Sequence, residues 1–240
     1  MKIEKSIIIL SGGLDSSILM YEMIDKPNIE VVAAICFDYG QRHKKEIECA
    51  KYLCDVNDIP LKVIDLGFFK DLTQGGSALT DNSIDVPTAA ESLGDSQALS
   101  YVPNRNMMML SIAVSYAESV GAENVFYGAG GDDEHSGYWD CTKEFLENIN
   151  KVISLNRKNK IQICAPYVNL SKKEIVKRGM GLKVPFENTW TCYNGREKSC
   201  GKCITCSNRI KSFIMNGLQD SLPYEIDIPW EKLIEKVRKK

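Results

Sequence analysis

The sequence IIILSGGLDSSIL (residues 7–19) joins an apolar run to a polar, glycine-containing turn. The run SIIIL at 6–10 is typical of a buried strand, and residues 15–25 indicate a helix that begins directly after the glycines. Gly12 and Gly13 permit positive φ and a close approach of the backbone to a ligand. Backbone N–H groups and the helix N-terminus then form a cradle for an anion. A lone Gly-Gly pair would indicate only a tight turn.

The polar side chains of this loop suit a phosphate and a cation together. Ser11, Ser16 and Ser17 supply hydroxyl donors, whereas the carboxylate of Asp15 would repel phosphate. Mg²⁺ bridges carboxylate and phosphate oxygens and removes that repulsion. No lysine occurs between Lys5 and Lys26, so the loop lacks the lysine of the ATPase P-loop. The loop is therefore expected to bind phosphates for a different bond cleavage.

Strand-like and helix-like segments alternate along the rest of the chain. Further strands are predicted at 30–37, 61–66, 124–128 and 161–166. Helices are predicted within 46–56, 104–121, 141–156, 171–180 and 206–217. Near-continuous apolar strands separated by helices predict an α/β fold with an open parallel sheet covered on both faces. Gly121 is expected to end the 104–121 helix, whose methionines are expected to fill the core.

One connection is unusually long. Residues 67–101 are rich in Gly, Ser, Thr, Asp and Pro and show no clear periodicity. A loop of this length inside a compact domain is usually functional or mobile.

Composition excludes several classes of protein. The chain has 240 residues, 44% of them hydrophobic and 26% charged, and a net charge of -2. This balance provides no overall basic field for a nucleic acid, and we expect no direct nucleic-acid partner. No apolar run reaches the roughly 18 residues of a membrane helix, and the N-terminus lacks a signal-peptide pattern. We therefore expect a cytoplasmic protein with no membrane partner, whose basic C-terminal KVRKK is a solvated helix end.

Four of the nine cysteines form a compact module. Cys192, Cys200, Cys203 and Cys206 have the spacing C-x7-C-x2-C-x2-C, which matches tetrahedral Zn²⁺. An iron–sulfur cluster also uses four cysteines and remains the alternative. A closed four-thiolate zinc site is structural, and here it would hold residues 188–209 against the core.

The other cysteines are expected to be ordinary buried residues, with Cys141 in a more polar setting. They are Cys36, Cys49, Cys54, Cys141 and Cys164.

Polar clusters follow the predicted strands, where the carboxyl ends of a parallel sheet face the ligand. FDYGQRHKKEIECA (37–50) contains Gln41, Arg42 and His43, although His43 could equally be a surface helix residue. YVPNRN (101–106) offers Arg105 for a phosphate or carboxylate. GAGGDDEHSGYWDC (128–141) indicates a polar substrate loop more than a metal site; its polar residues are Asp132, Asp133, His135, Tyr138 and Asp140. In LSKKEI (170–175), Lys172 or Lys173 could reach phosphate, or both could be solvated.

The motif SGG-x-DS resembles the signature of the PP-loop ATP pyrophosphatases. Enzymes of that superfamily split ATP between the α and β phosphates and transfer AMP to an oxygen of the substrate. The resemblance implies their adenine nucleotide alpha hydrolase-like, Rossmann-like fold and a loop that binds the leaving pyrophosphate. The implied ATP-binding residues are Leu10, Ser11, Gly12, Gly13, Leu14, Asp15, Ser16, Ser17, Ile18, Leu19 and Met20.

The assembled motifs resemble the 7-cyano-7-deazaguanine (preQ0) synthases over nearly the whole chain. The matching pieces are SGGLDS, DYGQRHKKEI, YVPNRN, SGYWDC, KKEI and TWTCYNG…CGKCITCSNR. The resemblance implies ATP-dependent conversion of 7-carboxy-7-deazaguanine and ammonia to the nitrile, in queuosine biosynthesis. It also implies one Zn²⁺ on the four cysteines and is compatible with a homodimer. Three parts are expected: a core (1–185), the cysteine module (186–220) and a C-terminal tail or helix (221–240).

The same resemblance suggests roles for the polar residues. The implied catalytic residues are Asp15, which would hold Mg²⁺, and the charge stabilisers Arg105 and Lys172. The implied substrate-binding residues are Gln41, Arg42, His43, Tyr138 and Asp140. No residue suggests a covalent nucleophile.

The chain departs from the family at one segment. The family reads close to SGYPDCRPEF where this chain has SGYWDCTKEF, so that Trp139 and Thr142 are changed, and the preceding segment is one residue longer. These changes fall where the base of the substrate is expected. Three alternatives therefore stay open: a paralogue acting on DNA or protein, a tRNA-thiolating PP-loop enzyme, and a zinc-stabilised nucleotide-binding module without catalysis.

Overall fold

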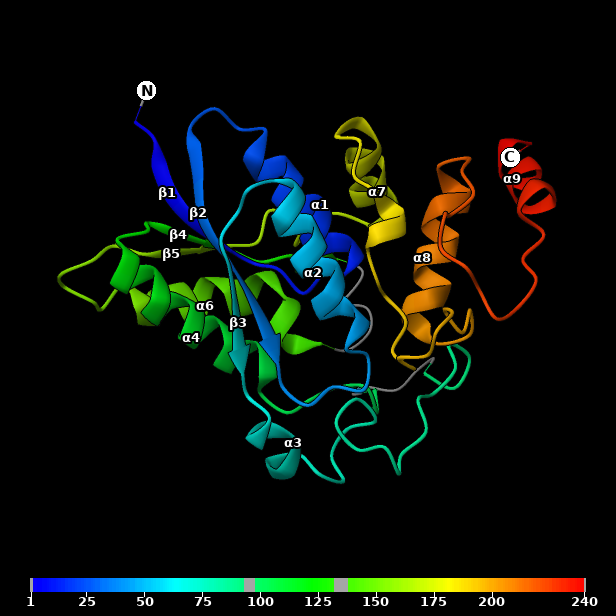
Figure 1. Cartoon of the computed structure of the whole chain (residues 1–240), viewed down its shortest axis with the longest axis horizontal. Coiled ribbons are helices and arrows are strands. Elements are labelled where there is room, and N and C mark those ends of the chain that lie inside the picture. The colour runs from blue at the N-terminus through cyan, green and yellow to red at the C-terminus, as the bar shows by residue number, and fades with distance from the viewer. Residues whose placement is uncertain (1, 93–97, 132–137, 240) are drawn as a thin grey trace.

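A five-stranded parallel sheet forms the centre of the molecule. The computed structural model describes residues 2–92, 98–131 and 138–239. The strands are β1 (Glu4–Ile9), β2 (Ile29–Asp38), β3 (Leu61–Asp65), β4 (Asn124–Phe126) and β5 (Gln162–Cys164). Their order is β3-β2-β1-β4-β5, and every pair is parallel. The predicted open parallel sheet is confirmed, and its strand order reverses between β1 and β4 (Figure 1).

The predicted helices are present, with small shifts at their ends, and one further helix, α3 (Phe68–Leu72), was not predicted. They are α1 (Leu14–Ile24), α2 (Lys45–Val56), α3 (Phe68–Leu72), α4 (Arg105–Val120), α6 (Lys143–Ile153), α7 (Lys172–Gly181), α8 (Ile204–Met215) and α9 (Trp230–Arg238). Two 3-10 turns, η1 (Trp139–Cys141) and η2 (Phe186–Asn188), complete the elements described. The strands β4 and β5 are shorter than predicted, although Tyr127 N–H, just after β4, still donates to the Cys164 carbonyl at 3.0 Å.

Alternate residues of the strands face two different helix layers. Ile7 packs in one cluster with residues of α4 and α6, and Ile8 packs in another with residues of α1, α2, α7 and α8. Figure 1 shows these two groups of helices on opposite sides of the sheet. Successive strand residues point to opposite faces, so a continuous apolar run fills both layers. Burial of each of these isoleucines contributes about 1.5–3 kcal/mol.

The ends of α4 follow local backbone rules. Gly121 adopts φ 70° just after α4, which confirms it as the stop signal.

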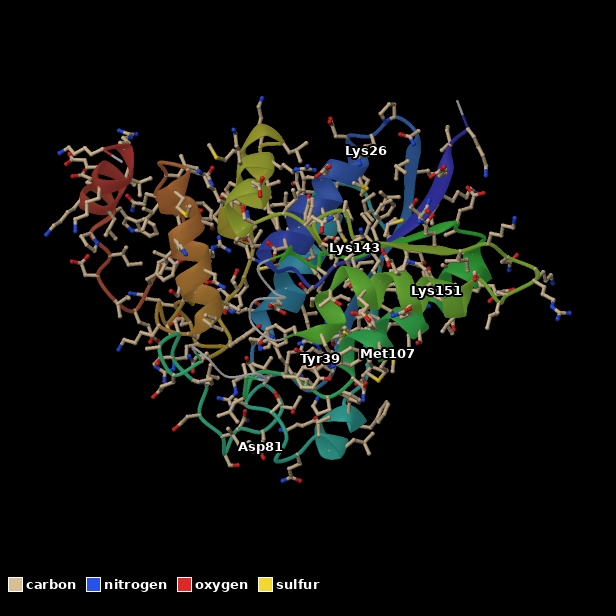
Figure 2. The ribbon with its side chains drawn as sticks, turned by 180° about the vertical axis from the view of Figure 1, so that it is seen from behind. Lys26, Tyr39, Asp81, Met107, Lys143 and Lys151 are labelled. Carbon is tan, nitrogen blue, oxygen red and sulfur yellow. The ribbon has the colours of Figure 1, made fainter. Side chains whose placement is uncertain are left out.

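Of the α4 methionines expected to fill the core, Met109 is buried and Met108 partly buried. Met107 is 42% exposed, and for this residue the prediction was wrong (Figure 2).

The described parts of the long 67–101 segment, residues 67–92 and 98–101, make specific contacts with the rest of the chain. The segment begins with α3, which the sequence analysis missed because five residues give too little periodicity. Arg42 donates to the carbonyls of Asp81 and Ile84 at 2.6 and 2.8 Å. Ala89 N–H donates to the carbonyl of Lys202 at 2.8 Å, which ties the segment to the cysteine module. Figure 1 shows the segment running from α3 towards the N-terminal end of α8.

The C-terminal part ends in the exposed helix α9, as the basic tail predicted. Its Trp230 ring lies 6.1 Å from the ring of Tyr224. Within the described ranges, no helix combines the length and apolarity needed to cross a bilayer.

Candidate active site at the carboxyl edge of the sheet

A cavity of about 250 Å³ opens at the carboxyl ends of β1, β2 and β4. Leu10 after β1, Tyr39 after β2 and Gly128 after β4 line it. The cavity therefore lies where the strand order reverses, which is the usual ligand site of an open parallel sheet. Sequence-predicted site residues that line it are Leu10, Ser11, Gly13, Leu14, Asp15, Ser16, Gln41, His43, Arg105, Tyr138 and Lys172.

The backbone of the glycine loop is packed tightly. Gly12 has φ 82°, and a Cβ placed on it would lie 1.9 Å from the carbonyl oxygen of Glu46. Only glycine fits this position. Gly13 has φ -74°, so the expected freedom to adopt positive φ is not used there.

Hydroxyl groups hold the loop in shape. Ser11 and Ser16 share a hydrogen bond of 3.0 Å between their Oγ atoms, and Ser11 Oγ accepts from Gly13 N–H at 3.1 Å. Both serines line the cavity. Ser17 Oγ instead donates to the Gly13 carbonyl at 2.6 Å and is fully buried.

Several residues of the implied ATP-binding segment lie outside the cavity lining. Ile18, Leu19 and Met20 are fully buried in the core beneath the loop. Their contribution is to fix the start of α1 against the sheet.

Asp15 and Lys172 form an ion pair between the first turns of α1 and α7. Both side chains line the cavity and are mostly buried. Ser171 and Glu174 form a capping box that fixes the start of α7, and thus the direction of Lys172. Lys173 is exposed, and of the two lysines only Lys172 lines the cavity.

In the turn after β2, some side chains hold the backbone in place and some line the cavity. Gln41 accepts from Tyr39 N–H at 2.8 Å and donates to the Phe37 carbonyl at 3.1 Å. Arg42 does not line the cavity, because its guanidinium is bonded to the 81–84 segment. His43 does line it and is 2% exposed, so the surface alternative for this residue is wrong.

Glu46, on the first turn of α2, is a cavity residue that the sequence analysis missed. Its Oε2 lies 3.5 Å from Nε2 of His43. Burial raises the pKa of Glu46 to about 8 and, with smaller contributions from Arg105 and Arg42, lowers the pKa of His43 to about 3. The pair is therefore neutral near pH 7.

Arg105 begins α4 and brings positive charge to the cavity. Its guanidinium donates to the hydroxyl of Tyr39 at 3.1 Å and to Oδ1 of Asn106 at 3.2 Å. It also lies 5.4 Å from the centre of the Tyr39 ring.

The 138–142 segment forms a further wall. Tyr138 lines the cavity, and its hydroxyl lies 2.6 Å from Ser100 Oγ. Asp140 is 2% exposed and stands outside the cavity lining, and burial raises its pKa. The buried thiol of Cys141 lines the cavity and accepts from Asn106 at 3.5 Å. The polar residues Asp132, Asp133 and His135 lie outside the described residues.

The two residues that depart from the family pattern have structural contacts. Trp139 is 43% exposed, donates to the Tyr101 hydroxyl at 2.9 Å and packs edge-on against Phe145. Thr142 caps α6 by accepting from Phe145 N–H at 3.0 Å. Neither side chain lines the cavity.

The four module cysteines are arranged as a site for one metal ion. Their Sγ atoms lie within 4.8 Å of one another, and all four residues are buried. Cys200 and Cys206 have sulfurs 3.9 Å apart. Zn–S bonds of about 2.3 Å in a tetrahedron place sulfurs roughly 3.8 Å apart. A multi-iron cluster separates its thiolates further, since several iron atoms lie between them. The cluster can therefore hold zinc.

Local geometry supports this site. Gly195 and Gly201 adopt φ 62° and 70°, and Cys200 Sγ accepts from the N–H groups of Lys202 and Cys203 at 3.4 and 3.3 Å.

The cysteine module also forms one side of the cavity. The lining residues from this part are Trp190, Thr191, Tyr193, Thr205, Asn208 and Arg209. Trp190 N–H donates to the Gly12 carbonyl at 2.9 Å, which joins the module to the glycine loop. Arg209 is 1% exposed, pairs with Asp220 at 2.6 Å and donates to Thr189 at 2.8 Å. The sequence analysis used this stretch only for its cysteines and missed these residues.

Comparison with known proteins gives one consistent result. The family model "Queuosine biosynthesis protein QueC" matches residues 5–217. A 7-cyano-7-deazaguanine synthase from Psychromonas ingrahamii is 44% identical over 222 residues, covering 92% of this chain and 98% of that protein. One of the same name from Caldicellulosiruptor saccharolyticus is 43% identical over 228 residues, covering 95% and 99%.

Two solved structures share the fold at low sequence identity. The NMN synthetase from Francisella tularensis aligns with a TM-score of 0.52 and 14% identity, covering 99% of this chain and 84% of its own. The U34-tRNA thiolase NcsA from Methanococcus maripaludis aligns with a TM-score of 0.50 and 17% identity, covering 100% and 73%. The fold of this chain is thus shared with enzymes of other names.

Proposed function

The chain belongs to the QueC family of queuosine biosynthesis proteins, and we propose that it converts 7-carboxy-7-deazaguanine, ammonia and ATP into 7-cyano-7-deazaguanine. The observation that carries the proposal is the near-full-length similarity to synthases of that name. The alternatives of a DNA- or protein-modifying paralogue, a tRNA-modifying enzyme and a non-catalytic module are not favoured by it. Trp139 and Thr142 do not disturb the proposal, because neither lines the cavity.

The proposed chemistry begins by activating a poor electrophile. A carboxylate resists attack by ammonia, and transfer of AMP to one of its oxygens creates a good leaving group. Ammonia then displaces AMP and gives the amide. Transfer of a second AMP to the amide oxygen allows elimination to the nitrile. The protein mainly has to position these groups and stabilise charge.

The glycine loop is the proposed phosphate site. Its backbone, with Ser11 and Ser16 at the cavity, would bind the pyrophosphate that leaves. Asp15 is the proposed ligand of Mg²⁺, which would neutralise phosphate charge. Lys172, which forms an ion pair with Asp15, would contact the same phosphates. Arg105, which also lines the cavity, would bring a second positive charge.

The deazapurine ring of the substrate is proposed to bind between the 138–142 segment and the cysteine module. Tyr138 from the first and Tyr193 from the second line the cavity with aromatic faces suited to a deazapurine. Arg42 and Asp140 lie outside the cavity lining, and we propose that they stabilise the segments that form it. The zinc ion on the cysteines would have no open position, and so we propose an architectural role for it. In this division, residues 1–185 supply the phosphate site and residues 186–220 supply the opposite wall.

The direct test is substrate-dependent pyrophosphate release by the purified chain. Release should require 7-carboxy-7-deazaguanine, and mass spectrometry should detect the nitrile only when ammonia is also present. No release above the level without substrate would overturn the proposed function.

A further inference from the structure

Three hydrogens must leave nitrogen during the proposed reaction, because ammonia carries three and the nitrile none. The proposed function thus requires a base beside the reacting nitrogen. We propose that the Glu46 carboxylate is this base and that His43 positions it. This inference rests on the proposed function and deepens it, by assigning the proton acceptor.

The location of Glu46 suits the reacting carbon. Its carboxylate lines the cavity, and its Oε1 lies 3.8 Å from the point where a Cβ on Gly13 would stand. The acid is therefore beside the glycine loop. In an acyl adenylate, one oxygen atom joins the carbon under attack to the α-phosphorus. A base next to the phosphate loop is consequently next to that carbon as well.

Other cavity groups of the described chain are poorer candidates. Asp15 is paired with Lys172. His43 has a pKa near 3 because of its burial, so it accepts a proton only weakly. Glu46, in contrast, has a pKa of about 8 from burial, and a carboxylate of that basicity is a good acceptor near neutral pH.

His43 holds the acid in place. Its Nε2 lies 3.5 Å from Glu46 Oε2, and no other described side chain forms an ion pair or hydrogen bond with that carboxylate. Ring contacts fix the imidazole, with Tyr193 at 5.6 Å and Tyr39 at 6.4 Å between centres. In this proposal neutral His43 carries its proton on Nε2, 3.5 Å from Glu46 Oε2, and orients the carboxylate without competing for the proton, so His43 is a positioning residue.

Each proton can be followed through the two stages of the reaction, amide formation and conversion of the amide to the nitrile. Ammonia forms the C–N bond, the C–O bond to AMP breaks, and one proton passes from nitrogen to Glu46. The amide oxygen then attacks the α-phosphorus of a second ATP, and pyrophosphate leaves. Two further N–H protons are removed, the electron pair of the last forms the C≡N bond, and AMP leaves with the C–O pair. Glu46 returns each proton to solvent between steps, and no oxidant or reductant is needed.

Glu46→Gln tests the assignment, because it keeps the size of the side chain and removes the base. ATP–pyrophosphate exchange with 7-carboxy-7-deazaguanine measures adenylation and involves no nitrogen. This exchange should stay within a few-fold of wild type in E46Q, while nitrile formation falls about 100-fold or more. Glu48→Gln is the matched control, since it changes an exposed carboxylate on the same helix; its nitrile formation should equal wild type.

The pH profile separates a base from a structural group. Supplying the amide in place of 7-carboxy-7-deazaguanine removes ammonia from the reaction. The titration of ammonia then cannot affect the pH profile. Because Glu46 gains its charge as pH rises through about 8, kcat/KM for nitrile formation should rise through that value. The rise should be missing in E46Q. His43→Gln should keep a rise but shift its midpoint. The titratable groups that face Glu46 are His43, Cys36, Tyr39, Cys49 and Arg105.

The outcomes distinguish this inference from the proposed function. Absence of substrate-dependent exchange in the wild type would refute the function itself. Normal nitrile formation in E46Q, with exchange intact, would refute only the role of Glu46. If raised Mg²⁺ concentration restored E46Q, Glu46 would be a metal ligand and the base assignment would be wrong.

Discussion

Single residues of the glycine loop carry both steric and chemical constraints. Gly12 is confined by its positive φ and by the Glu46 carbonyl, whereas Asp15 is placed for its charge. Substitutions at these two positions should therefore fail for different reasons.

Gly12→Ala should lower the free energy of unfolding by more than the roughly 1–2 kcal/mol that positive φ alone costs. The excess arises because the new Cβ would lie 1.9 Å from the Glu46 carbonyl oxygen, so α2 must move. Gly121→Ala is the control, since Gly121 has φ 70° with no atom within 4 Å. Urea denaturation compares the two. Equal losses would show that the backbone contact at Gly12 is unimportant.

Asp15→Ala should lower turnover at least about 100-fold, because it removes the proposed ligand of the Mg²⁺ that would neutralise phosphate charge in the cavity. Zinc content should be unchanged, since the cysteines lie in a separate cluster. Pyrophosphate release and metal analysis measure the two quantities. Asp25→Ala, at the exposed far end of α1, should leave turnover intact. Retained turnover in D15A would contradict the proposed Mg²⁺ role.

At the level of elements, α8 is connected to the cavity by a buried ion pair. Arg209 and Asp220 have side-chain exposures of 1% and 0%, and Arg209 lines the cavity. The pair links α8 to the segment that follows it and to Thr189.

Asp220→Asn should lower the free energy of unfolding by about 3–5 kcal/mol, because it leaves the Arg209 charge buried without a partner. Glu225→Gln breaks the exposed Arg196–Glu225 pair and should cost at most about 1 kcal/mol. Thermal or urea unfolding checks both values. Similar small losses would mean that water reaches Arg209 after the substitution.

At the level of the whole molecule, the active cavity is shared between the sheet edge and the cysteine module. Trp190 N–H bonds to Gly12, and Lys45 lies 4.7 Å above the Trp190 ring. Metal binding in the module should therefore influence the phosphate loop.

Removal of zinc by a chelator should lower Tm and raise KM for both ATP and the deazaguanine substrate. The metal contributes folding free energy to the module, and without it one wall of the cavity loosens. Cys203→Ser should reproduce both effects, and Cys49→Ser, beside the cluster but not in it, should reproduce neither. A zinc-free protein with unchanged KM would disprove the coupling.

Much of this organisation was readable from local sequence. Apolar runs, the Gly12 turn, the stop at Gly121 and the spacing of the four cysteines depend on neighbours within a few residues, and so the parallel sheet and the metal cluster could be predicted. The short α3 was not, because five residues carry no periodic signal.

The tertiary structure alone showed that Lys172 and not Lys173 lines the cavity, turned Arg42 away from the cavity and buried His43 beside Glu46. It also brought Arg209 and Tyr193 of the cysteine module to the cavity lining. These properties depend on which segments meet and how much water they exclude. Desolvation of a carboxylate such as Glu46 is a sum over residues from β2, α2, α4 and the cysteine module, and no local pattern of the sequence encodes that sum.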